Sequence, residues 1–191
     1  MSSSNWHTRR DLLRVLALGA GVAMGACSTV ASAPAGALST ADYRLGPADQ
    51  LRITVFNEPG LTGLFVIGSQ GTIAYPLVGD VRAAGLTVTQ FTEALRTALD
   101  QYVRSPSVSV EVANYRPFFI LGEVQRPGTY PYSVDLTVLN AVATAGGFTY
   151  RANESRVFIR RAGESEEHVY DLTVATPVMP GDTVRIGERL F

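Results

Sequence analysis

The sequence predicts an α+β protein with two small mixed domains, because short strand patterns, few helical patterns and frequent turn residues alternate along the chain. Apolar residues alternate with polar ones in brief runs, as at Leu51, Ile53 and Val55, which is the period of a half-buried strand. Glycine and proline separate these runs, whereas only two segments of the body have helical spacing. With 191 residues, of which 46% are hydrophobic and 17% charged, the chain is globular and long enough for two such domains.

Residues 1–26 are predicted to be a signal peptide and not part of the fold. Arg9, Arg10 and Arg14 give a basic start, and the apolar stretch 15–26 follows it. A stretch of that length rises only about 18 Å as a helix, which is too short for a bilayer core of about 30 Å. The pair Arg9 and Arg10 resembles a twin-arginine signal. An ordinary basic leader is the alternative, so the sequence leaves the export route (Sec or Tat) open.

Cys27 is the only cysteine, and it stands where the apolar stretch ends. The run Met24-Gly25-Ala26-Cys27 resembles a bacterial lipobox, with Met24 where leucine is usual. Several acyl chains on one cysteine give stable membrane anchoring, because each buried methylene contributes about 0.8 kcal/mol. We therefore predict lipidation at Cys27 and a flexible tether over residues 27–41, with a buried free thiol as the alternative reading. A single cysteine excludes an intramolecular disulfide framework and multi-cysteine metal sites.

The first domain is predicted over residues 42–113. A turn at residues 46–49 precedes a strand at 51–55, and further strands are expected at 64–67, 72–75, 80–83 and 108–112. A helix is expected after Thr87, which forms a capping-box pattern with Gln90. The apolar stripe of this helix comprises Val88, Phe91, Leu95, Leu99 and Tyr102. The turn residues expected here are Gly46, Pro47, Asp49, Gly71, Pro76 and Gly79.

The second domain is predicted over residues 114–191. Strands are expected at 116–121, 129–132 and 184–186, together with a hairpin of 156–160 and 168–172. A helix at 136–145 should end at the glycine pair Gly146 and Gly147. A tight turn at Arg126-Pro127-Gly128 should place Gly128 at positive φ. The turn residues expected here are Gly122, Pro127, Gly128, Gly146, Gly147, Pro180, Gly181 and Asp182.

The two domains share a short repeated motif. Residues 47–53, PADQLRI, parallel residues 180–186, PGDTVRI, with the common pattern P-x-D-x-[LV]-R-I. Two copies do not make a solenoid, so we interpret them as one turn-to-strand device used twice.

No pattern in the sequence indicates catalysis or metal binding. His168 is the only histidine outside the leader, and no nucleophile motif or glycine-rich phosphate loop is present. The formal net charge of -1 disfavours a nucleic-acid partner. We therefore predict a protein that is not an enzyme and uses no cofactor or metal.

The ordered motifs resemble the outer-membrane polysaccharide export family. Residues 43–63, 71–87 and 105–112 resemble its polysaccharide export domain, although Ala48 stands where the family usually has glycine. Residues 119–132, with the helix ending in AGGF, resemble the soluble-ligand-binding β-grasp (SLBB) domain that follows, and residues 178–191 are typical of short members. The resemblance implies the fold expected above, a polysaccharide export domain followed by a β-grasp-like domain.

The resemblance also implies a function in transport. Family members form ring-shaped oligomers that enclose a path for exopolysaccharide or capsule, so the expected partners are further copies of the chain, the polysaccharide and an inner-membrane polysaccharide co-polymerase. Longer members carry a C-terminal amphipathic helix that is missing before Phe191, which leads us to expect a separate outer-membrane β-barrel. The expected location is the periplasmic side of the outer membrane of a Gram-negative bacterium, with a lipid anchor. The alternative is a periplasmic adaptor lipoprotein that binds a ligand or glycan.

Tyrosines are candidate platforms for sugar stacking along such a path. Tyr75, Tyr130, Tyr132 and Tyr150 are candidates for that role. Tyrosine also suits the pleated surface of a strand, and this structural role is the simpler interpretation.

Overall fold

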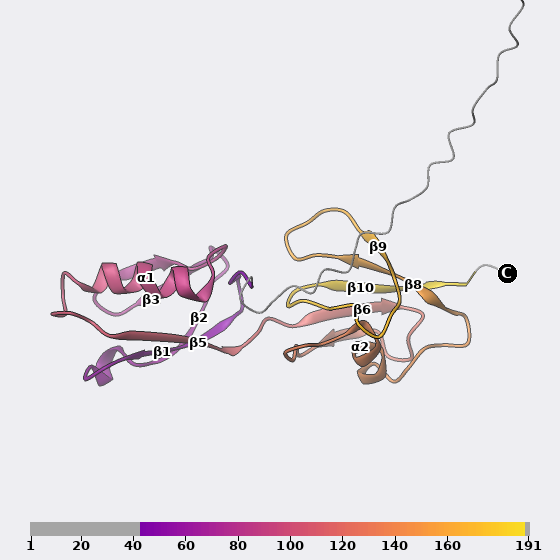
Figure 1. Ribbon diagram of the computed structural model, residues 1–191, viewed down its shortest axis with the longest axis horizontal. Coiled ribbons are helices and arrows are strands. Elements are labelled where there is room, and N and C mark those ends of the chain that lie inside the picture. Colours follow the sequence, from indigo (N-terminus) through magenta and orange to yellow (C-terminus); the bar gives the residue numbers. More distant parts are fainter. Residues whose placement is uncertain (1–42, 190–191) are drawn as a thin grey trace, which may run out of the picture. The chain divides into compact units, whose positions relative to one another are not determined.

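The computed structural model describes residues 43–189, which form two sets of strands with one α-helix each (Figure 1). The predicted signal residues Arg9 and Arg10, the predicted lipidation site Cys27 and the tether lie outside the described residues. The α+β class predicted from the alternating runs is confirmed.

The first set of strands has a three-stranded antiparallel sheet at its centre. Its order is β2-β1-β5, with β1 (Gln50–Val55) between the edge strands β2 (Gly63–Val66) and β5 (Val108–Asn114). A hairpin of β3 (Thr72–Tyr75) and β4 (Gly79–Arg82) and a short 3-10 helix, η2 (Pro59–Leu61), complete the set. The helix α1 (Val88–Leu99) packs on β5, as Figure 1 shows.

The core of this first set forms where β1 and α1 turn their apolar faces to each other. Leu51, Ile53 and Val55 on β1 are buried at alternate positions, as the sequence period predicts, and they share one cluster with Phe91 and Leu95 of α1. Each fully buried side chain of this size contributes about 1.5–3 kcal/mol. These contacts hold α1 on one face of the sheet, and among the described residues no helix covers the opposite face.

The start of α1 is predicted correctly and its end is not. Thr87 Oγ1 accepts a hydrogen bond from Gln90 N, and the Gln90 side chain accepts one through Oε1 from Thr87 N, so the expected capping box is confirmed. The helix ends at Leu99 with Asp100 as its cap, and Tyr102 is 56% exposed. The prediction that Tyr102 extends the buried stripe is therefore wrong, because the helical period stops one turn earlier.

The second set of strands is a five-stranded mixed sheet of order β7-β6-β10-β8-β9. Its strands are β6 (Phe118–Gly122), β7 (Gly128–Tyr130), β8 (Ala152–Arg160), β9 (His168–Asp171) and β10 (Thr183–Glu188). The central strand β10 pairs parallel with β6 and antiparallel with β8. The expected hairpin of residues 156–160 and 168–172 is confirmed as β8 with β9.

One face of this second sheet carries its core. Inward side chains of β6, β8 and β10 cluster with Val138, Ala141 and Val142 of α2 (Val138–Thr144), and Figure 1 shows α2 on one side of the sheet. Gly146 and Gly147 follow α2 with φ of +89° and +95°, a backbone conformation that glycine adopts without strain.

The turn before β7 differs from the prediction. Gly128 begins β7 and pairs with Ile120 of β6, and it is not among the glycines at positive φ. The prediction of positive φ at Gly128 is therefore wrong, because this residue already pairs with β6 and has the extended backbone of a strand.

The repeated motif forms two equivalent turns, each leading into the central strand of its sheet. Asp49 N donates to Gly46 O, and Asp182 N donates to Met179 O, each at 3.1 Å. The third residue of each turn has positive φ, +72° at Ala48 and +84° at Gly181. Both turns thus have the form of a type II turn, whose third position favours glycine.

Replacing Ala48 with glycine should stabilise the protein. A residue with a Cβ in the left-handed region is strained by about 1–2 kcal/mol, and glycine removes this strain. Glycine also raises the conformational entropy of the unfolded chain, which offsets part of the gain in stability. Because Ala48 is exposed, removing its methyl group loses little packing. We expect Ala48→Gly to raise the free energy of unfolding by about 0.5–1 kcal/mol in urea denaturation. The control Ala74→Gly, in the strand β3, should instead lower it by a similar amount.

Candidate functional site

The first turn is held by the buried carboxylate of Asp49. This side chain is 0% exposed and accepts hydrogen bonds from Tyr43 Oη at 2.6 Å, Gly46 N at 2.8 Å and Arg116 N at 2.8 Å. The Arg116 guanidinium also lies 3.9 Å from it. Burial and the hydrogen bond to Asp49 raise the pKa of Tyr43 far above its usual value, so this phenol stays protonated as a donor.

The second turn repeats this arrangement around Asp182. Its carboxylate is 1% exposed, accepts a hydrogen bond from Met179 N at 2.7 Å and pairs with Arg161 Nη1 at 2.5 Å. Burial raises the pKa of Asp182, and the guanidinium of Arg161 together with the Met179 N–H opposes that rise. The burial cost is the larger effect.

Arg116 contacts both turns. Its Nε donates to Pro180 O at 3.0 Å, and its guanidinium lies over the Tyr43 ring at 5.6 Å from the centroid. A Cβ added at Gly181 would lie 2.6 Å from Arg116 Nε, and one added at Gly46 would overlap the same guanidinium. Glycine at these two positions is therefore what lets Arg116 lie against the backbone.

The remaining predicted turn residues lie at the ends of strands and helices. At Gly122, the last residue of β6, an added Cβ would collide with the carbonyl of Ile186 on β10. Gly71 and Gly79 have positive φ and flank the hairpin strand β3, Pro76 follows β3, Pro127 precedes β7, and Gly146 and Gly147 follow α2.

These turn residues shape the backbone between strands and helices, and they do not come together as a group of side chains that could carry out a reaction. Among residues 43–189 no group of acidic, histidine or cysteine side chains is arranged to hold a metal ion. His168 is exposed, and its Nε2 lies 3.1 Å from the Glu164 carboxylate. In the same part of the chain, no helix has the length and apolar character needed to cross a membrane.

The tyrosines suggested as sugar platforms have different environments. Tyr75 is buried, donates to Leu61 O and has a pKa raised by burial to about 12, so its proposed role at a surface is wrong. Tyr130 donates to Arg126 O, and Tyr132 packs edge-on against Tyr115. Tyr150 is highly exposed.

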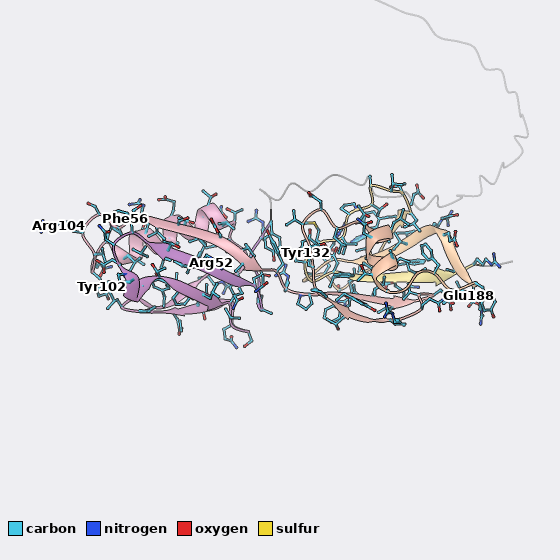
Figure 2. The ribbon with its side chains drawn as sticks, turned by 90° about the horizontal axis from the view of Figure 1, so that it is seen from below. Arg52, Phe56, Tyr102, Arg104, Tyr132 and Glu188 are labelled. Carbon is cyan, nitrogen blue, oxygen red and sulfur yellow. The ribbon has the colours of Figure 1, made fainter. Side chains whose placement is uncertain are left out.

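The face of the first sheet opposite α1 carries exposed apolar side chains that no sequence motif marks. Leu64 and Val66 on the edge strand β2 are 51% and 55% exposed. Arg52 lies between Leu64 and Glu111 in the strand register, and Figure 2 labels it on this sheet. Figure 2 also shows the exposed Phe56 and Tyr102 with Arg104 at one end of this set of strands. A strand at 64–67 is expected from the sequence, but only the sheet order shows that, within residues 43–189, this face has no covering element.

Comparison with known families finds a match in each half of the described chain. Residues 37–113 match the family described as "Polysaccharide biosynthesis/export protein", and residues 117–170 match the SLBB domain. From here on, the first set of strands is called the export domain, and the second set, which includes β10 beyond the matched residues, is called the SLBB domain.

Three relatives carry names connected with polysaccharide. The chain is 37% identical over 173 residues to the exopolysaccharide production protein ExoF of Rhizobium meliloti, covering 78% of this chain and 41% of that protein. It is 29% identical to the EPS I polysaccharide export outer membrane protein EpsA of Ralstonia solanacearum, covering 64% and 40%. It is 25% identical to the polysialic acid transport protein KpsD of Escherichia coli, covering 78% and 28%. The chain therefore spans less than half the length of these relatives.

The buried acid of the second turn predicts a pH dependence of stability. Because the pKa of Asp182 is raised in the folded state, the native protein binds this proton more tightly than the unfolded chain. The stability that this group contributes should fall as pH rises from about 3.9, the unfolded value, through the raised folded pKa. Asp182→Asn does not titrate, so the difference in unfolding free energy, wild type minus variant, should decrease across that window in urea denaturation.

The exposed Asp80→Asn serves as the control for this experiment, because it makes the same change of side chain at the surface and not in a buried turn. A wild-type advantage over Asp182→Asn that grows with pH would mean that Arg161 outweighs burial.

Proposed function

Because the chain belongs to the polysaccharide biosynthesis/export family, we propose that it is a lipid-anchored subunit of a conduit that exports polysaccharide across the cell envelope. The observation that carries this proposal is the ordered pair of an export domain and an SLBB domain. The resemblance predicted from the sequence motifs, an outer-membrane polysaccharide export protein with one SLBB domain, is confirmed at the level of the family. The names of the relatives support export as the process.

A conduit requires a wall and not a nucleophile. The buried carboxylates of the described chain, those of Asp49 and Asp182, hold turns, and His168 faces solvent beside Glu164. We infer that the protein moves its polymer without chemical change, through the shape and charge of its surface.

We further propose that the wall is a ring of identical subunits. Within residues 43–189, β2 and β5 are the two edge strands of the first sheet, and an edge strand can offer backbone groups to a neighbouring chain. Leu64 and Val66 add an apolar surface beside one of these edges. A contact that joins two different surfaces of one protein repeats around an axis and closes into a ring when its rotation allows.

The proposed location is the periplasmic side of the outer membrane. Relatives from two Ralstonia sources are named as export outer membrane proteins. Acylation at Cys27 would hold the subunit at that membrane through the tether, and Ser28 after it is compatible with sorting there. Partners in the inner and outer membranes, as expected from the resemblance, would continue the path on either side.

Deleting the gene should reduce extracellular polysaccharide at least about tenfold, because no other wall would carry the polymer. The measurement is the carbohydrate precipitated from culture supernatant, with restoration by the wild-type chain.

A double variant, Leu64→Glu with Val66→Glu, should fail to restore export and should sediment as a monomer, because it places two charges on the proposed subunit contact. The control Ala74→Glu adds an exposed charge on β3 and should restore export. Unchanged secretion of every polymer in the deletion strain would refute the proposed function.

Replacing Cys27 with serine should abolish membrane anchoring. The hydroxyl cannot form the thioether that attaches the lipid, so incorporation of a labelled fatty acid should be lost and the protein should move from the membrane to the soluble fraction. The control Ser28→Ala keeps the thiol and should be labelled as wild type. Persistent labelling of the Cys27→Ser variant would contradict the lipidation site.

A further inference from the structure

A cavity of about 870 Å³ has a strongly one-sided charge. Its sixteen lining residues include three arginines, Arg44, Arg116 and Arg160, and no aspartate or glutamate. The whole chain, by contrast, has a formal net charge of -1. This volume lies within the range of pockets that hold small ligands, and the charge of the lining selects for an anion.

The wall of this cavity is a row of side chains across the SLBB sheet. Phe119 on β6 and Arg160 on β8 both lie opposite Thr183 on the central strand β10. They project from the face opposite the core, since Phe118, Ile120 and Ile159 on the same strands point into the cluster with α2. Phe119 is 42% exposed and its neighbour Leu121 is 37% exposed. The aromatic ring of Phe119 and the guanidinium of Arg160 therefore lie on the same face of the sheet, on either side of Thr183.

Arg160 hydrogen-bonds to uncharged groups, although the Glu167 carboxylate interacts with its charge over a longer distance. Its Nη2 donates to Thr183 Oγ1 at 3.1 Å and its Nη1 to Glu164 O at 3.4 Å, and neither acceptor is charged. The next row along the sheet differs, because Arg185 is paired with the Glu167 carboxylate at 2.5 Å and stacks over Phe158. Within residues 43–189 no carboxylate lies within 4.0 Å of the Arg160 guanidinium.

The two other arginines add to the same field. Arg44 Nη1 donates to Gly85 O at 2.9 Å, which leaves further N–H donors of this guanidinium unused by that bond. Arg116 is fixed by Pro180 O and by Asp49, so it contributes a positioned but partly compensated charge. A planar guanidinium binds a carboxylate through two parallel hydrogen bonds, which suits recognition of an acidic group.

We propose that this groove binds an acidic sugar residue of the exported polymer, with the carboxylate on Arg160 and Arg44 and the C–H face of the sugar ring on Phe119. This inference rests on the proposed function and names its substrate class as a carboxylated polysaccharide. The aromatic ring and Leu121 bury the apolar face of a pyranose, which a simple inorganic anion lacks. Binding is weak, because a path for a polymer must release each residue that it holds.

The test compares one glycan with and without its charge. The purified full chain, labelled with nitrogen-15, is titrated with a hexamer of galacturonate and with the fully methyl-esterified hexamer, and amide shifts of Phe119, Arg160 and Thr183 are followed. We expect these amides to shift with the acidic hexamer and the ester to bind at least about fivefold more weakly. Added salt should weaken the acidic hexamer alone.

Two matched variants test whether the positive charge that binds the acidic hexamer is that of Arg160. Arg160→Gln removes the guanidinium from the groove and should weaken binding of the acidic hexamer at least about fivefold. Arg156→Gln makes the same change on the same strand, but Arg156 does not line the cavity, so binding should stay within about twofold of wild type. Phe119→Ala should weaken both hexamers, because both lose the ring on which the sugar lies.

Several outcomes would overturn the inference. They are equal binding of both hexamers, equal loss in the two arginine variants, absence of any shift at millimolar acidic hexamer, and displacement by equimolar inorganic phosphate. Self-association that depends on Arg160, without glycan binding, would assign the groove to a second copy instead. Each result concerns the groove alone: a chain that restores export but binds no acidic hexamer leaves the proposed function intact, whereas unchanged secretion in the deletion strain refutes that function whatever the titration shows.

Discussion

A buried carboxylate at the start of a central strand is the interaction on which each sheet depends. Removing an aspartate from water costs several kcal/mol, and the fold offsets this cost only by aiming donors at it. Asp49 receives three hydrogen bonds, two of them from backbone N–H groups, and Asp182 receives Met179 N and the Arg161 guanidinium. An alanine in either place would leave these donors unpaired in the interior, which costs more than the bond itself contributes.

Each of these carboxylates joins two distant parts of the chain. Asp49 precedes β1 and binds the backbone of Arg116, which follows the antiparallel neighbour β5. Asp182 precedes β10 and pairs with Arg161, which follows the antiparallel neighbour β8. The same motif thus closes the same corner of two different sheets. Because each turn holds only the end of its strand, it covers neither face of the sheet. Among the described residues, a helix covers one face of each sheet.

The sequence was sufficient for what is local and insufficient for what is long-range. Alternation predicted β1 and β5, the Thr87 and Gln90 pattern predicted the start of α1, and the Pro-x-Asp motif predicted both turns. Burial of Tyr75 and exposure of Tyr102 were missed, because the environment of a tyrosine depends on which elements cover it. The parallel pairing of β6 with β10 joins residues about sixty positions apart, so no local period encodes it. The groove was missed for the same reason, since Phe119 and Arg160 meet only through that pairing.

The position of Arg116 has a consequence for how the sequence can drift. One guanidinium lies against Gly46 in the first turn and Gly181 in the second, and a Cβ at either would displace it. A substitution at one glycine therefore changes the cost of a substitution at the other, because the first displacement has already vacated the space that the second would need. The two copies of the motif are separated by more than a hundred residues and yet are epistatic. Divergence of one copy alters the selective constraint on the other.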